Sequence, residues 1–191
     1  MTQQQFDFLY NKAEELMKKT KDLNHDWSHI QRVEENALKI KKLLPDKEQI
    51  NIDDKILKLA CAWHDISYAS YKASPRQYFL EARRSIRVIK KYFKQVDIIE
   101  SELKLITNMV LYHDVLMSFR YRNGKRNLYN KIIQDADFLD GVDSERINKV
   151  KEMAEHSLYW KFINKVLIPL FLGRVIKNKS KFLNLEESTK I

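Results

Sequence analysis

Apolar residues recur every three to four positions along most of the chain, which is the period of an amphipathic α-helix. A first stripe covers residues 6–16, and a second covers 30–44 and stops just before Pro45. Asp53 is placed to cap a third helix, whose apolar face reaches Trp63. The pattern therefore predicts three consecutive helices in the first third of the chain.

The same period continues through the middle of the chain. It predicts a fourth helix at about 78–93 and a fifth at about 98–112. Asn123-Gly124 marks a turn inside a basic loop, and the next helix is expected to begin near Tyr129. Polar segments that are short compared with the helices separate these elements, as in a helical bundle.

Residues 144–178 predict two further helices with a kink at Pro169, and residues 179–191 form a tail that can fray. Only 3 Gly and 3 Pro occur in 191 residues, which leaves few tight turns for a sheet of many strands. No repeat or linker composition divides the chain. We therefore expect one all-α domain over 1–191, of about six to eight helices, with its motif-bearing core at 22–143.

The bulk chemistry of the chain narrows the class of protein. The single cysteine, Cys61, has apolar neighbours and cannot form an intrachain disulfide, which is typical of a reducing compartment. The longest apolar run, 166–172, is too short to span a bilayer, and no secretory signal precedes the first helix. A cytoplasmic protein is expected. Its net charge of +9 favours an anionic partner, although solvated lysine-rich helix faces give the same total.

Three short motifs carry the candidate chemistry. They are His-x-x-Arg-Val at 29–33, Ala-Trp-His-Asp-Ile at 62–66 and Asp-Ala-Asp-Phe-Leu-Asp at 135–140. In this order the motifs resemble the HD superfamily of metal-dependent phosphohydrolases. The stretch from His25 to His29 is similar to a bacterial subgroup of small HD proteins, some of which cleave nucleoside triphosphates. The resemblance covers about residues 22–143.

The resemblance implies a metal site with four protein ligands, which are His29, His64, Asp65 and Asp137. Imidazoles and carboxylates together suit a borderline divalent ion, and no thiolate is available for a structural zinc site. We expect Mn²⁺, with Co²⁺, Ni²⁺, Fe²⁺, Mg²⁺ or Zn²⁺ as alternatives. Four ligands leave coordination positions open, so the site predicts hydrolysis of a phosphate ester or anhydride by a metal-bound hydroxide.

Further residues are expected to act on the substrate or to support the ligands. His25, His113 and Asp140 have catalytic or supporting roles, although His25 and His113 can also be structural. The expected phosphate-binding cations are Arg32, Lys72, Arg76, Arg83 and Arg84. Relatives with two metals usually carry another histidine before His113, and none occurs in 74–84. This difference predicts a site with one ion.

Two classes of function remain open from the sequence. The favoured one is an enzyme that hydrolyses a nucleotide, either a triphosphate to monophosphate and pyrophosphate or a monophosphate to a nucleoside. The other is a basic protein that binds nucleic acid or a membrane and keeps the metal site only as a relic. Residues 157–191 carry seven Lys or Arg against two Glu, which would supply its contact surface. The complete ligand set favours the enzyme.

Overall fold

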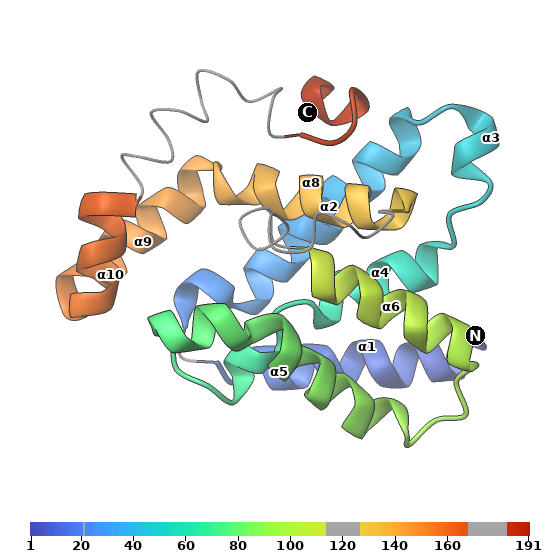
Figure 1. Cartoon of the computed structure of the whole chain (residues 1–191), viewed down its shortest axis with the longest axis horizontal. Coiled ribbons are helices and arrows are strands. Elements are labelled where there is room, and N and C mark those ends of the chain that lie inside the picture. The colour runs from blue at the N-terminus through green and yellow to red at the C-terminus, as the bar shows by residue number, and fades with distance from the viewer. Residues whose placement is uncertain (21, 114–126, 168–182) are drawn as a thin grey trace.

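The computed structural model describes residues 1–20, 22–113, 127–167 and 183–191 (Figure 1). These residues form helices and no strand, so the protein is an all-α helical bundle. The α-helices of the described part are α1 (Gln3–Met17), α2 (Trp27–Leu43), α3 (Asp46–Gln49), α4 (Asp54–Trp63), α5 (Pro75–Phe93), α6 (Glu100–Tyr112), α8 (Leu128–Gly141), α9 (Ser144–His156) and α10 (Leu158–Phe162). Seven of these nine have ten residues or more, because α3 and α10 are little more than one turn.

Short elements join or follow these helices. They are the 3₁₀ turns η1 (Leu23–His25), η2 (Ile66–Ala69) and η6 (Glu187–Lys190), and a π-helical turn η4 (Ile163–Leu167). The expected turn at Asn123-Gly124 and the expected kink at Pro169 lie outside the described residues. None of the helices in the described ranges combines the length and the apolar character of a membrane span.

Side-chain caps set the starts of the helices that carry the motifs. Asp26 accepts a hydrogen bond from the backbone N–H of His29, and Asp53 caps α4 as the sequence predicted. The fourth helix begins earlier than the apolar stripe indicated. Ser74 caps it and Pro75 occupies its first position, where the missing N–H costs nothing.

α4 is the central helix of the bundle, since seven of its ten residues are buried. It packs against α1, α2 and α6, while α8 lies along α2 and α5 lies against α6 (Figure 1). Trp63 fills the core at the end of α4 and donates a hydrogen bond to the carbonyl of Leu9. Whatever follows Trp63 is therefore placed inside the protein rather than at its surface.

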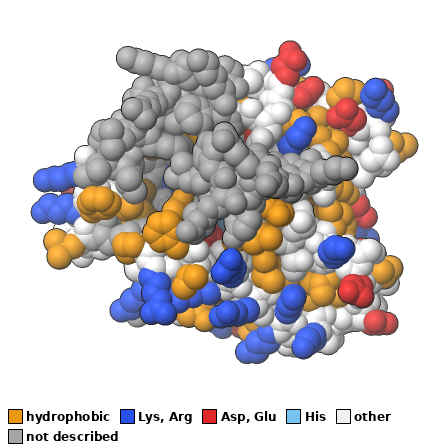
Figure 2. Space-filling view, viewed as in Figure 1, with side chains coloured by type: hydrophobic (Ala, Val, Ile, Leu, Met, Phe, Trp, Pro, Cys, Tyr) orange, Lys and Arg blue, Asp and Glu red, His pale blue; other side chains and the backbone are white. Residues whose placement is uncertain are grey.

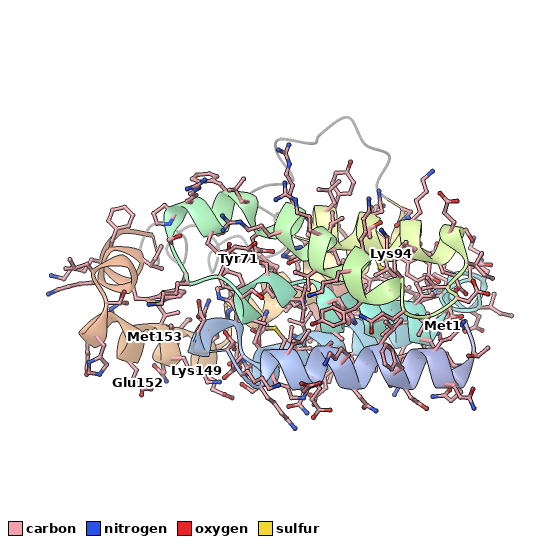
Figure 3. The ribbon with its side chains drawn as sticks, turned by 90° about the horizontal axis from the view of Figure 1, so that it is seen from below. Met1, Tyr71, Lys94, Lys149, Glu152 and Met153 are labelled. Carbon is pink, nitrogen blue, oxygen red and sulfur yellow. The ribbon has the colours of Figure 1, made fainter. Side chains whose placement is uncertain are left out.

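α9 and α10 have a small apolar cluster of their own, separate from the main core. Val150, Ala154 and Trp160 form it, packed by Ala73, Met153 and Ile163. Figure 3 shows these two helices at one end of the molecule, with Met1 at the other end. α9 contacts the main bundle mostly through charged side chains, which reach η1, the start of α2 and the end of α8.

Candidate metal centre

The four expected ligands come together in the structure from three separate parts of the chain. His29 lies in the first turn of α2, His64 and Asp65 follow the end of α4, and Asp137 lies near the end of α8. His29 Nε2 is 3.1 Å from His64 Nε2, 3.2 Å from Asp65 Oδ2 and 3.6 Å from Asp137 Oδ1. Buried His and Asp groups in this protein could therefore hold a metal ion.

These separations are those of atoms that share one ion. Ligands bound at about 2.1 Å lie about 3.0 Å apart at neighbouring octahedral corners and about 3.4 Å apart at tetrahedral corners. His64 Nε2 is 3.3 Å from Asp65 Oδ2 and 3.9 Å from Asp137 Oδ1, close to the same range. One divalent ion can therefore contact all four side chains after small movements.

The hydrogen bonds of the outer nitrogens fix which nitrogen of each imidazole is free. His64 Nδ1 is 2.7 Å from the carbonyl oxygen of Cys61, so this nitrogen must carry a proton and donate it. His29 Nδ1 is 2.7 Å from Asp140 Oδ2 and donates in the same way. Neutral rings in these tautomers direct both Nε2 lone pairs at each other and at two carboxylates. Such a cluster of acceptors requires a cation, which is the condition for a metal site.

The end of α4 explains how adjacent residues reach one point. The helix ends at Trp63, His64 is the C-cap, and Asp65 leaves helical geometry with a ψ of 13°. Inside a helix, neighbouring side chains point about 100° apart, which would separate their ligand atoms. The sequence predicted that the ion must lie off the helix end, and the structure places the helix end there.

The carboxylates of the centre are held in their charged form. Burial raises the pKa of Asp65, but the charges of His64 and His25 and hydrogen bonds from His113 and His29 lower it well below its usual range. Burial also raises the pKa of Asp137, and the charges of Arg146, His64 and His29 outweigh that effect. Both groups are therefore ionised at neutral pH, as metal ligands must be.

Asp140 supports the site from α8. It is buried, and its Oδ2 accepts the proton of His29 Nδ1, while its Oδ1 accepts from Arg32 Nε. Burial raises its pKa, but the hydrogen bond and charge of His29 and the charge of Arg146 lower it below the usual range. Asp135 points elsewhere, because two residues correspond to about 200° of helix rotation between it and Asp137.

Asp135 instead binds the end of the chain. Its two oxygens accept hydrogen bonds from the backbone N–H groups of Asn184 and Leu185 and from the hydroxyl of Ser188. Leu183 and Leu185 pack against the main core. Within the tail that was expected to fray, residues 183–191 thus lie on α8, and residues 179–182 lie outside the described residues.

Two histidines flank the ligands, as the motifs indicated. His25 stacks on Tyr68 with ring centroids 3.8 Å apart, and its Nε2 lies 4.0 Å from Asp65 Oδ2. His113 is the C-cap of α6, and its Nδ1 is 2.7 Å from the carbonyl oxygen of Val110, so it donates there. The Nε2 of His113 lies 3.6 Å from Asp65 Oδ1. His156 is exposed at the end of α9, outside the site.

The expected phosphate-binding cations are not gathered at the ligands. Arg32 pairs with Asp140 and Glu145, and Arg84 donates to Gln77 and stacks on Tyr71. Lys72, Arg76 and Arg83 are exposed. For Arg83 the reason is helical phase, since it follows the buried Glu81 by two residues and so points to the opposite side of α5.

The cations that do reach the centre come from α9 and were missed by the sequence reasoning. Arg146 Nη1 lies 3.3 Å from Asp137 Oδ1 and 3.1 Å from Asp140 Oδ2, and its Nε donates to Asn24. Lys149 contacts Asp26 and Ser28 at the start of α2 and is labelled in Figure 3. No local motif distinguishes these residues from other charged residues of an exposed helix. Glu81 was also missed, although Gln77, Glu81 and Ser85 form a polar stripe at helical spacing.

The centre opens toward solvent on one side. The side chains of His29 and His64 are fully buried, whereas Asp137 is 19% exposed and Arg146 is 13% exposed. No protein-family model, curated protein or solved structure matches the chain. The resemblance to the HD superfamily thus stays a prediction that rests on the motif residues. The geometry of the centre stands independently of it.

Proposed function

We propose that the protein is a metal-dependent phosphohydrolase of the HD type, which cleaves a phosphorus–oxygen bond in a nucleotide. The observation that carries the proposal is the convergence of two imidazole nitrogens and two carboxylate oxygens, all in the form that binds a cation. A divalent ion held there would lower the pKa of a water molecule and offset negative charge on a phosphoryl oxygen. The ligand set suits Mn²⁺ or a similar ion.

The chain's own residues supply the rest of the proposed reaction. Asp140 holds the ring of His29 in one tautomer and one orientation. Arg146 lies beside Asp137 on the open side, where its guanidinium can bind a phosphoryl oxygen in a charge-assisted hydrogen bond. The oxygen of water joins phosphorus, the bond to the leaving oxygen breaks, and that oxygen takes a proton. His25 is the ionisable side chain placed to give that proton, since its ring lies next to Asp65 and is 12% exposed.

The substrate class follows from charge. The tail of a nucleoside triphosphate carries about four negative charges, more than one divalent ion neutralises. Arg146 and Lys149 lie on the side of α9 that faces the centre and can bind such a tail. We therefore propose a nucleoside triphosphate, cleaved to monophosphate and pyrophosphate, ahead of a monophosphate cleaved to a nucleoside.

A hydrolysis screen tests the proposal. The metal-free protein is loaded with Mn²⁺, Co²⁺, Ni²⁺, Mg²⁺ or Zn²⁺ and assayed on nucleoside triphosphates, monophosphates and an aryl phosphate, with phosphate and pyrophosphate measured separately. Metal-dependent release of pyrophosphate is expected. Release of phosphate from monophosphates would indicate a nucleotidase, and no hydrolysis by protein that has bound the metal would reject the proposal.

The binding-protein alternative can be tested on the same samples. Most of its basic C-terminal residues lie at 168–182, outside the described residues. Figure 2 shows Lys and Arg side chains gathered along the lower part of the molecule, where α5 carries the exposed residues Arg76, Arg83, Arg87, Lys90, Lys91 and Lys94. Salt-dependent binding to nucleic acid or to anionic vesicles, without hydrolysis, would favour this alternative.

A further inference from the structure

We propose that the centre holds a second divalent cation, bound by Asp65 Oδ1, His113 Nε2 and Glu81 Oε1, with Asp65 bridging the two ions. The inference rests on the proposed metal site and extends it to two carboxyl-bridged positions. Asp65 turns one oxygen to each side. Its Oδ2 lies 3.2 Å from His29 Nε2, and its Oδ1 lies 3.6 Å from His113 Nε2.

His113 presents a free nitrogen to this second position. Its Nδ1 donates to the carbonyl of Val110 at the end of α6, so the neutral ring directs the lone pair of Nε2 at the carboxylates. His64 has the same arrangement at the end of α4, where its Nδ1 donates to Cys61. His64 thus has one free nitrogen, which faces His29 at 3.1 Å and serves the first position. His113 is therefore left to serve the second.

Glu81 completes the second set from α5. Its Oε1 lies 3.4 Å from His113 Nε2, and the side chain is buried together with Asp65 and His113. The separations of 3.4 Å and 3.6 Å match atoms that share one ion bound at about 2.1 Å. They exceed the roughly 2.7–2.9 Å of a hydrogen bond between a charged imidazole and a carboxylate. The spacing thus favours a metal ion over a proton.

Charge supports the second ion. Asp65, Asp137, Asp140 and Glu81 bring four carboxylates, and Arg32 and Arg146 bring two guanidiniums, which leaves a net charge of about −2 with neutral imidazoles. One divalent ion makes the centre neutral. A second ion makes it positive, which attracts a phosphorylated substrate. Histidine is missing from 74–84, but Glu81 supplies a ligand from that same stretch.

Metal stoichiometry tests the inference on the full chain. The protein is stripped with a chelator and titrated with Mn²⁺, and bound metal is measured by equilibrium dialysis with elemental analysis and by electron paramagnetic resonance. We expect two Mn²⁺ per chain, with the spin-coupled spectrum of ions about 3.5–4 Å apart. Glu81→Gln should bind one ion and lose the coupling. Glu35→Gln removes an exposed glutamate of α2 and should keep both ions and the coupling.

The outcomes separate this inference from the proposed function. One Mn²⁺ per chain at saturation, with metal-dependent hydrolysis, would overturn the second site and leave the function standing. Two coupled ions without hydrolysis of any nucleotide or phosphate ester would support the second site and reject the function. If circular dichroism shows that Glu81→Gln is unfolded, His113→Gln takes its place. The spectrum of the wild-type protein decides the stoichiometry in either case.

Discussion

His29 and Asp140 meet across the contact between α2 and α8, where Nδ1 of the imidazole lies 2.7 Å from Oδ2 of the carboxylate. This bond leaves Nε2 free for a cation. Asp140→Ala should weaken Mn²⁺ binding about 10–100-fold, because nothing then fixes the tautomer and orientation of His29. Asp140→Asn retains an oxygen acceptor and should lose less. Calorimetric titration measures both constants, and unchanged affinity in the alanine variant would show that the hydrogen bond does not support metal binding.

Loss of a ligand should remove the metal but not the fold. His64→Ala or Asp65→Ala is expected to bind no stoichiometric Mn²⁺ and to have no hydrolytic activity. Far-UV circular dichroism should stay nearly unchanged, since the core packing of α4 ends at Trp63. The carbonyl of Cys61 loses its partner in His64→Ala, a cost of about 1 kcal/mol. His156→Ala, at an exposed histidine, is the control, and elemental analysis of the three variants decides.

Arg146 should affect the substrate and the metal in opposite directions. Arg146→Met removes a positive charge 3.3 Å from Asp137 Oδ1, so Mn²⁺ affinity should rise or stay the same. The kcat/KM for a nucleotide should fall at least about 10-fold, because a charge-assisted bond to phosphate is lost. Arg87→Met, at an exposed arginine of α5, should match the wild type. If metal affinity and kcat/KM both fell, Arg146 would only order Asp137.

Asp135 should anchor the end of the chain. Asp135→Ala leaves the N–H groups of Asn184 and Leu185 and the hydroxyl of Ser188 without their acceptor, so we expect the free energy of unfolding to fall by about 2 kcal/mol. Residues 183–191 should then become sensitive to protease. Asp97→Ala, at an exposed aspartate, serves for comparison. Equal rates of C-terminal cleavage in the two variants, followed by mass spectrometry, would contradict this role.

The sequence alone was enough to predict the helical class, because that depends on local periodicity and caps. The apolar stripe of residues 30–44 and the cap at Asp53 are local signals, and both correspond to helices of the structure. The positions of the candidate ligands relative to helix ends were predictable for the same reason. His64 follows Trp63 at a helix end, so one ion can contact both His64 and Asp65.

The tertiary structure decided which charged residues reach the centre. Arg76 and Arg83 come from a stretch that looks suited to phosphate, but the rotation of α5 turns them to solvent and turns Glu81 inward. Arg146 has no distinguishing motif, and it reaches Asp137 because α9 folds back over the start of α2. Periodicity gives the angle of a side chain around its own helix, whereas the packing of one helix on another sets which side chains face each other. The sequence therefore determined the helices and a candidate ligand set, and only the packing of α5 and α9 determined what surrounds it.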